Sequence, residues 1–356
     1  MKLWTKILTL LMTLSLLLMT LAACNGDSDK DTGDTSEAPS ADATTPAEES
    51  EAPDEPSSNG EAYTIGIIQY VEHAALDAAR EGFVDALKDN GYSENVTFDI
   101  QNAQADTSNL ATISQRFVNN KADLVLAIAT PAAQSVAGVT ADIPILGTAI
   151  TDYEVAKLVD SNDAPGANVT GTSDMNPIAE QIALLMELVP DAETIGIVYA
   201  SNEDNSVLQA AIAKEAAEAL GLKVIESTVT SSNDVQQVTD SVASKVDALY
   251  IPTDNIYASS MPIVREVCAQ YGVPTICGES GMVESGGFAT MGISYYDLGY
   301  QTGLMAVQIL NGEAEPSTMP IQFAQNFEFS INGEVAEELG IQIPDKYADA
   351  VLGGTA

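Results

Sequence analysis

The sequence predicts an α/β protein made of two similar lobes, each built on a parallel β-sheet. Short, continuously apolar runs alternate with segments in which apolar residues recur at helical spacing, as in residues 63–68 (YTIGII) followed by residues 74–89. The same order occurs a second time, beginning at residues 194–199 (TIGIVY). Continuous apolar strands separated by helices are typical of a parallel sheet that is covered on both faces.

In the first half, residues 124–129 (LVLAIA) predict a buried strand, because no polar residue alternates with the apolar ones. Residues 74–89 predict a helix, because their apolar residues fall on one helical face. The elements predicted for this half are strands at residues 63–68, 95–100, 124–129 and 143–146, and helices at residues 74–89 and 109–120.

The second half repeats this order, and its turns correspond as well: IATPAAQ in the first half stands where IPTDN stands in the second. Each half is long enough to form its own hydrophobic core. The elements predicted here are strands at residues 194–199, 223–227, 248–251 and 273–276, and helices at residues 206–220 and 235–245.

The N-terminus carries the pattern of a secretory signal. Lys2 and Lys6 precede a mostly apolar stretch, residues 7–19, and small residues then lead to Cys24. The stretch is shorter than the about 20 apolar residues of a comfortable membrane span, although an N-terminal anchor helix is an alternative. The position of Cys24 resembles a bacterial lipoprotein signal at residues 1–23. That resemblance implies lipidation of Cys24 and an extracytoplasmic protein anchored to the cell membrane.

Residues 24–62 differ in composition from the rest of the chain. They are rich in Asp, Glu, Ser, Thr, Pro and Ala, and they contain no large apolar residue. Such a segment buries too little surface to offset its ordering entropy, and its like charges keep it extended. We therefore expect an acidic, disordered tether between the membrane and the folded part.

Charge and missing motifs exclude several classes of function. The chain has 52 acidic and 13 basic side chains, which argues against binding to nucleic acid or to anionic lipid. A single histidine, His73, rules out a two-histidine metal site, and HExxH, GxSxG, P-loop and GxGxxG motifs are absent. We expect no metal, no cofactor and no enzymatic activity. A hydrolase or isomerase that uses the paired carboxylates of Glu72, Asp254 and Glu279 is the alternative.

The two remaining cysteines, Cys268 and Cys277, lie in a region too large to need a disulfide bond. Buried free thiols are the default expectation, with a bridge as the alternative.

In open parallel sheets, ligands bind outside the carboxyl ends of the strands. Two such lobes facing each other would form a cleft lined by their strand-end loops. Polar residues there also occur for local reasons, as caps and turns. Matched polar residues in both halves nevertheless favour a binding cleft. The candidate ligand-binding residues are Gln69, Tyr70, His73, Leu76, Thr130, Ala132, Ala133, Thr148, Asn202, Asn205, Ser206, Asp254, Asn255 and Glu279.

Several longer segments resemble one known family. GIIQYVEHAALDAAREGF, IATPAAQ, NVTGTSD, IPTDN and MGISYYDLGYQTG resemble the tryptophan/tyrosine-type substrate-binding lipoproteins of ABC importers, over residues 63 to about 344. The resemblance implies a type I periplasmic-binding-protein fold, in which two Rossmann-like lobes joined by three crossovers close around one small ligand. The implied partners are a permease and an ATPase, and the receptor is expected to be a monomer.

The resemblance also places the lobes and their crossovers. It implies an N-terminal lobe of residues 63–171 plus about 293–326, and a C-terminal lobe of residues 172–292 plus about 327–350. The crossovers are expected near residues 170–172, 291–293 and 327–329.

An aromatic amino acid is the implied ligand, and its charges must be paired in a dry cleft. We expect Asp254 and Glu279 to include the partner of the ammonium. The backbone N–H groups of Ala132 and Ala133, at a predicted helix start, are candidates for binding the carboxylate, and the Thr130 hydroxyl is another.

Further hydrogen bonds are expected from Asn202 and Ser206. Tyr70, Leu76 and the ring of His73 are candidate walls for an aromatic side chain. His73 is alternatively a solvated residue at a helix start.

Tyr295 and Tyr296 are expected to pack a helix and not to contact ligand. Two rival functions stay open: a sugar or nucleoside receptor of the same fold, and a sensory ligand-binding module. The only tryptophan, Trp4, lies in the predicted signal, so a tryptophan-stacked sugar site is excluded from the mature protein.

Overall fold

The computed structural model describes residues 62–324 and 326–353, all of which belong to one unit of the chain. The predicted signal, Cys24 and the predicted tether up to residue 61 lie outside these residues. Within the described ranges, no helix has the length and apolar character needed to cross a membrane.

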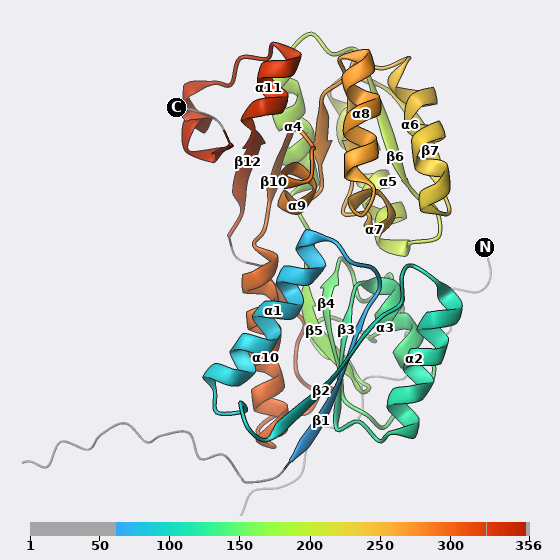
Figure 1. The fold of residues 1–356 in the computed structure, drawn as a ribbon, viewed down its shortest axis with the longest axis vertical. Helices are drawn as coiled ribbons and strands as arrows, with labels where there is room; N and C mark the ends of the chain where they lie inside the picture. The colour runs from blue at the N-terminus through green and yellow to red at the C-terminus, as the bar shows by residue number, and fades with distance from the viewer. Residues whose placement is uncertain (1–61, 325, 354–356) are drawn as a thin grey trace, which may run out of the picture. The chain divides into compact units, whose positions relative to one another are not determined.

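The N-terminal lobe is built on a six-stranded sheet in the order β11-β5-β4-β3-β1-β2, with every neighbouring pair parallel. Helices α1 and α10 cover one face of the sheet, and α2 and α3 cover the other (Figure 1). The strands are β1 (Tyr63–Gln69), β2 (Val96–Asn102), β3 (Leu124–Ile128), β4 (Ile145–Ile150), β5 (Val169–Ser173) and β11 (Gln322–Phe323). The helices are α1 (Ala74–Asp89), α2 (Thr107–Asn119), α3 (Thr130–Ala137) and α10 (Tyr295–Leu310).

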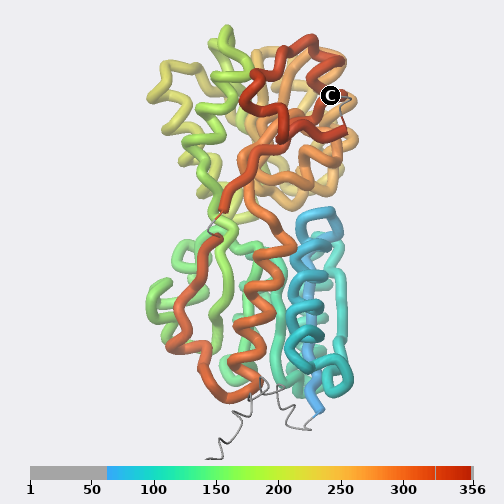
Figure 2. The backbone as a smooth tube through the Cα atoms, turned by 90° about the vertical axis from the view of Figure 1, so that its left-hand side faces the viewer, coloured from blue at the N-terminus to red at the C-terminus, as the bar shows by residue number. Residues whose placement is uncertain are grey.

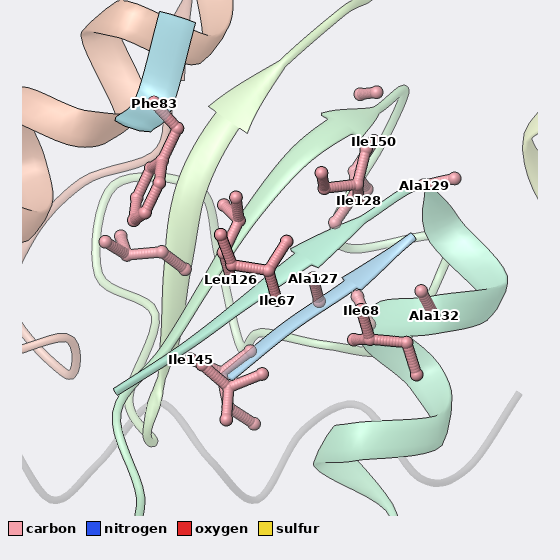
Figure 3. Packing of buried hydrophobic residues seen from close by; sticks show 14 of the residues in the cluster. Ile67, Ile68, Phe83, Leu126, Ala127, Ile128, Ala129, Ala132, Ile145 and Ile150 are labelled. Carbon is pink, nitrogen blue, oxygen red and sulfur yellow. The ribbon is translucent and has the colours of Figure 1, made fainter. Parts of the chain in front are cut away.

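The core of this lobe follows from the continuous apolar strands. Successive strand residues point to opposite faces of a sheet. Ile67 accordingly points toward Phe83 of α1, and the next residue, Ile68, points toward Ala132 of α3 (Figure 3). All four side chains are fully buried, as expected for a sheet covered on both sides.

Helices α1 and α10 pack with their backbones in contact. A Cβ atom at Gly299 would overlap the backbone oxygen of Ala79, and one at Gly82 would overlap the backbone oxygen of Tyr296. Glycine at these positions therefore permits an approach that any larger residue would prevent. The pair lies side by side in two perpendicular views (Figures 1 and 2).

The C-terminal lobe is built on a seven-stranded sheet in the order β13-β12-β10-β9-β8-β6-β7. Its neighbours are parallel except for the antiparallel pair β10 and β12. Helices α4 and α5 cover one face, and α6 and α8 cover the other. The strands are β6 (Thr194–Ala200), β7 (Lys223–Val229), β8 (Ala248–Ile251), β9 (Thr275–Cys277), β10 (Ala289–Gly292), β12 (Glu328–Asn332) and β13 (Val351–Leu352). The α-helices are α4 (Ile178–Leu188), α5 (Asp204–Ala219), α6 (Val235–Ala243), α7 (Asn255–Ala258), α8 (Met261–Tyr271), α9 (Ser280–Glu284) and α11 (Gly333–Leu339), with short 3₁₀ helices η1 (Ser232–Asp234) and η2 (Asp345–Ala350).

The chain passes between the two sheets after β5, between β10 and α10, and between β11 and β12 (Figure 2). The first passage comes later than the expected residues 170–172, because β5 pairs with β4 as far as Ser173. The third comes earlier than the expected residues 327–329, since Glu328 and Phe329 already pair with β10 in the second sheet.

The predicted fold class, two α/β lobes with parallel sheets joined by crossovers, is confirmed. The strand and helix predictions differ from the structure mainly at their ends. For example, α2 begins at Thr107, not at residue 109, because the Asp106 side chain accepts the N–H groups of Ser108 and Asn109 and so caps the helix. Cys268 lies in α8, Cys277 lies in β9, and both are free and buried.

Candidate functional site

A cavity of about 10 Å³ lies where strand ends of both sheets meet. This is room for about one water molecule, well below the about 300–1,000 Å³ that is common for small-molecule pockets. The residues that line it are His73, Leu76, Ala149, Asp174, Asn205, Thr253, Asp254, Asn255, Ala258, Glu279 and Tyr295. Because the N-terminal lobe provides some of them and the C-terminal lobe others, the cavity has the position expected of a binding cleft.

Four buried acidic residues surround this cavity or adjoin its lining: Asp174, Glu203, Asp254 and Glu279. Three of them are the residues before a helix, since Glu203 precedes α5, Asp254 precedes α7 and Glu279 precedes α9. A helix N-terminus carries partial positive charge, which makes it a favourable place for a carboxylate. The fourth, Asp174, follows β5 at the first passage between the lobes.

The carboxylate of Asp254 is fully engaged by its own lobe. One oxygen accepts the N–H of Ala200 at 2.5 Å, and the other accepts the N–H of Tyr257 at 2.8 Å. Burial raises the pKa of Asp254. The two backbone donors act in the opposite direction, so Asp254 is first of all a structural cap that also faces the cavity.

Glu279 and Glu203 each keep one oxygen without a hydrogen-bond partner. Glu279 Oε2 accepts the N–H of Gly281 at 2.5 Å, while its Oε1 is buried and unpartnered. Glu203 Oε2 accepts the side-chain amide of Asn255 at 2.5 Å, and its Oε1 is likewise unpartnered. Burial raises the pKa of Glu279 to about 8. Burial, followed by the negative charge of Asp254, raises the pKa of Glu203 to about 8.

Asp174 is held by two hydroxyl groups. Thr151 Oγ1 donates to one of its oxygens at 3.0 Å, and the Tyr295 hydroxyl donates to the other at 2.7 Å. Burial raises the pKa of this carboxyl too. Tyr295, which was expected only to pack a helix, therefore lines the cavity and positions an acid in it.

No lysine or arginine lines the cavity to balance these acids. Burial lowers the pKa of His73 to about 4, so its ring is neutral at pH 7. Buried carboxyl groups require a cation or a proton. Among the described residues, no group of His, Cys, Asp and Glu side chains is arranged to hold a metal ion.

The N-terminal lobe supplies most of the apolar lining. Leu76 and Ala149 come from this lobe, as does the ring of Tyr295. Ala149 adopts a φ of 56°, which is unusual for a non-glycine residue, at a bulge where β4 shifts register against β5. His73 Nε2 reaches Asn255 Oδ1 of the other lobe at 3.3 Å, while His73 Nδ1 is unpartnered.

Six of the predicted site residues line the cavity: His73, Leu76, Asn205, Asp254, Asn255 and Glu279. Asn205 donates its amide to the Thr253 carbonyl at 2.9 Å and leaves its own oxygen unpartnered.

The other predicted residues support the loops or lie elsewhere. Gln69 bonds Val71, Asp77 and Arg80 within its own lobe, and Thr148 pairs with Thr172. Tyr70, Thr130 and Ser206 are buried beside the site without lining the cavity, and Asn202 is exposed.

The expected role of Ala132 and Ala133 does not fit the structure. Both of their N–H groups donate to the carbonyl of Ala129, so neither points a free donor at a ligand. Helix α3 begins at Thr130, so Ala133 makes the ordinary i→i−4 helix bond to Ala129 and Ala132 makes an i→i−3 bond to the same carbonyl.

Asp174, Ala149, Thr253, Ala258 and Tyr295 also line the cavity but were not predicted. Two of these five, Thr253 and Asp174, lie in segments that the sequence analysis had singled out. Thr253 lies in the IPTDN turn, and Asp174 ends NVTGTSD.

A model of the family described as ABC transporter substrate binding protein matches residues 64–351 of the chain. A curated relative, the tyrosine-binding protein of Clostridioides difficile (strain R20291), is 41% identical over 280 residues, which cover 78% of this chain and 81% of that protein.

Two crystal structures are similar over most of the chain. A domain from Streptococcus pneumoniae in complex with L-Trp is 40% identical, covers 82% of this chain and 100% of its own, and superposes with a TM-score of 0.79. The ligand-free, open structure of a substrate-binding protein with adhesive properties from Clostridium difficile is 44% identical, with 82% and 99% coverage and a TM-score of 0.63.

A solute-binding protein from Bacillus halodurans with bound myo-inositol is 15% identical, with 80% and 99% coverage and a TM-score of 0.57, and shares the fold alone. The matches over most of the chain are to binding proteins, which confirms the prediction that this chain is not an enzyme. A protein of this kind is an extracytoplasmic component of a transporter. The chain belongs to the family of ABC transporter substrate-binding proteins.

Proposed function

We propose that this protein captures an aromatic amino acid, tyrosine or tryptophan, outside the cell and delivers it to an ABC permease and its ATPase. The observation that carries the proposal is the unpartnered, buried oxygen of Glu279 in a cavity without a basic side chain. An α-ammonium group placed there would satisfy that oxygen and supply the missing positive charge. The tyrosine-binding relative and the complex with L-Trp support the choice of ligand class.

Glu279 is the preferred partner of the ammonium. The sequence favoured Asp254 equally, but both Asp254 oxygens already accept backbone N–H groups. Asp174, held by Thr151 and Tyr295, lines the same cavity and adds negative charge.

The ligand carboxylate is proposed to lie at the N-terminus of α1, whose end residues His73 and Leu76 line the cavity. Helix α1 has 16 residues, and no side chain caps its first N–H groups. Free N–H groups at the start of a long helix attract an anion. The ligand ring would then contact Leu76, Ala149 and Tyr295, which provide apolar surface.

The rival ligand, a sugar or nucleoside, is less compatible with this cavity. A neutral ligand would donate hydrogen bonds but bring no charge to the surrounding carboxyl groups. Desolvated carboxylates without a cation are costly. A sugar would leave these acids to be neutralised by protons alone, which their raised pKa values permit, so the preference for an amino acid rests on the unpartnered Glu279 oxygen and on the relatives.

Calorimetry with Glu279→Gln tests the assignment of the ammonium partner. Removing one partner of a buried ion pair costs about 3–5 kcal/mol, which is a loss of roughly a hundredfold to a few thousandfold in affinity for tryptophan or tyrosine. The matched control is Glu284→Gln, which changes an exposed carboxylate at the end of the same helix and should bind like the wild type.

Removing the ammonium charge from the ligand, in place of the carboxylate from the protein, tests the same contact. N-acetyl-L-tryptophan lacks the ammonium charge, so it should bind weakly to the wild type and lose little further affinity in Glu279→Gln. If Glu279→Gln binds tryptophan within threefold of wild type, Glu279 is not the partner. If the wild type binds myo-inositol, glucose or a nucleoside and none of tryptophan, tyrosine and phenylalanine, the ligand class is wrong.

The membrane anchor is a separate proposal, supported by the signal pattern that ends at Cys24. Lipidation of Cys24 would tether the receptor through the acidic segment of residues 24–62. Cys24→Ala should move the protein from the membrane fraction to the medium. Retention of that variant on membranes after detergent-free washing would contradict lipidation at this cysteine.

A further inference from the structure

A buried hydrogen bond joins the two lobes without touching the cavity. The side-chain amide of Gln209, in α5 of the C-terminal lobe, donates to Thr151 Oγ1 at 2.7 Å. Thr151 directly follows β4 of the N-terminal lobe. Gln209 is fully buried and Thr151 is 2% exposed, and neither residue lines the cavity.

Each half of this contact is positioned by its own lobe. The side-chain oxygen of Gln209, Oε1, accepts the N–H of Thr253 at 3.1 Å, and its side-chain nitrogen, Nε2, also donates to the Thr253 hydroxyl. The Thr151 hydroxyl donates to Asp174 at 3.0 Å, and its backbone carbonyl accepts the hydroxyl of Ser173 at 2.8 Å. Both sides therefore keep partners within their lobes, and only the bond between them depends on how the lobes are arranged.

The bond is directional and ends on an acid of the site. Gln209 donates to Thr151, Thr151 donates to Asp174, and Tyr295 donates to the other oxygen of Asp174. Successive hydrogen bonds of this kind polarise and strengthen one another in a low-dielectric interior. Asp174 and Tyr295 line the cavity, so this chain links a contact between the lobes to the ligand site.

The chemistry requires an amide at position 209. A glutamine side chain can accept the N–H of Thr253 with its oxygen while both of its N–H bonds donate, one to Thr253 and one to Thr151. Glutamate has the same shape but no N–H donor, and it would place a further negative charge near Asp174. The hydroxyl of Thr151 is required as well, because it accepts one hydrogen bond and donates another. Valine has the same shape but can do neither.

Between residues that the structure describes, two further hydrogen bonds that join the lobes differ from this one in kind. His73 and Asn255 meet over the cavity and belong to the site itself. Gln134 donates to Asp204 at 2.8 Å in an exposed position, where water can replace either partner at little cost.

We propose that Gln209 is a positioning residue whose amide, through Thr151, holds the lobes together around the bound ligand. The proposal rests on the proposed function, in which closure of the lobes retains the ligand. Breaking this bond should shorten the lifetime of the closed complex and leave the encounter of ligand with the separated lobes almost unchanged. The loss should thus fall on the dissociation rate.

Stopped-flow fluorescence with L-tryptophan measures both rates. The only tryptophan of the chain is Trp4, so the full chain with Trp4→Phe contains none and the ligand is the sole indole. We expect Gln209→Glu and Thr151→Val each to raise the dissociation rate about tenfold, the equivalent of roughly 1.4 kcal/mol. The association rate should change less than threefold. Thr151→Ser, which keeps the hydroxyl, should stay near wild type, and so should the exposed control Asp204→Ala.

A double-mutant cycle and a distance measurement separate this role from a merely structural one. If Gln209 and Thr151 act through their mutual bond, Gln209→Glu combined with Thr151→Val should cost little more than either change alone. Paired fluorescent labels, one on each lobe, should report fewer closed molecules at saturating tryptophan in both variants. Both changes also remove a buried bond within one lobe, Gln209 to Thr253 or Thr151 to Asp174, so the melting temperature of the ligand-free protein should fall further than for Asp204→Ala. The role in closure is therefore read from the coupling between the two changes and from the closed fraction.

The outcomes distinguish the proposal from the function on which it rests. If the wild type binds no aromatic amino acid, the proposed function fails. If the wild type binds tryptophan and both variants keep its dissociation rate, the role of Gln209 is refuted. It is refuted as well if the two changes are additive, or if they slow association instead.

Discussion

Replacing Glu279 with glutamine should let the receptor close without ligand. In the structure described, where Glu279 is buried, burial raises the pKa of Glu279 from its ordinary value of 4.5 to about 8. When the lobes separate, water reaches this carboxyl and its pKa returns toward the ordinary value. Closure of the empty cleft therefore takes up a proton. The equilibrium favours closure at low pH and loses it as pH rises from 4.5 toward 8.

The size of the effect follows from the two pKa values. At pH 7, protonating a carboxyl with an ordinary pKa of 4.5 costs about 3.4 kcal/mol, at about 1.36 kcal/mol per unit, which disfavours empty closure roughly three-hundredfold. The neighbouring acids Asp174 and Glu284 act in the same direction by raising this pKa. A ligand ammonium would replace the proton, so the cost would apply only to the empty receptor.

Paired labels on the two lobes, read without ligand, measure the closed fraction. For the wild type we expect that fraction to rise about tenfold per unit as pH falls from 7 toward 5. Glu279→Gln should close more readily at pH 7 and depend less steeply on pH, the remaining dependence coming from Glu203, Asp174 and Asp254, whose pKa values burial also raises. Glu266→Gln, which changes an exposed acid in α8, should behave as wild type. A wild type whose empty lobes have the same separation at pH 5 and pH 7.5 would refute the reasoning, and so would a Glu279→Gln variant that stays open.

Three further predictions concern packing, capping and thiol reactivity. Gly299→Ala should force helix α10 away from α1 and lower the free energy of unfolding by about 1–3 kcal/mol. Calorimetry should show this as a fall of several degrees in Tm, and Leu304→Ala, on the exposed side of the same helix, should lower Tm less. Asp254→Asn should lower the free energy of unfolding by about 1 kcal/mol, measured in urea, and weaken tryptophan binding less than Glu279→Gln does; a larger binding loss would make Asp254 the main ammonium partner. Burial raises the pKa of Cys268 to about 12 and that of Cys277 further, so neither thiol should react with iodoacetamide at pH 8 until the protein is unfolded, as mass spectrometry can check.

Most of the fold could be predicted because its strands are apolar along their whole length. Residues 63–68 and 124–129 became β1 and β3, which are buried at nearly every position. Strand β5 was missed because its sequence, VTGTS, is polar. Its two threonines are fully buried because each hydroxyl has a partner: Thr170 donates to the Met319 carbonyl, and Thr172 pairs with Thr302. Those partners are distant in sequence, so no local pattern reveals them.

The candidate site could be predicted where a recognised strand leads straight into it. Asp254 and Glu279 were found because they follow the apolar strands β8 and β9. Asp174 was missed together with the polar strand before it. The free N–H groups expected at Ala132 and Ala133 were wrong because α3 begins at Thr130, so both residues already lie in its first turn and donate to the Ala129 carbonyl. The first residue of a helix is not determined by the apolar pattern of the sequence alone.

Helix α10 belongs to the N-terminal lobe, yet it is made after most of the C-terminal lobe. During synthesis and export, the face of α1 that carries Gly82 has no covering partner until Tyr295–Leu310 has emerged, because only α10 packs closely against it. The second sheet also lacks β12 and β13 at that point, but its covering helices α4, α5, α6 and α8 have already been made, whereas the first sheet still lacks α10 over β4 and β5. Long-range closure of this kind slows folding and prolongs the exposure of apolar surface. A chain interrupted before Tyr295 would thus leave its earliest part the most prone to aggregate.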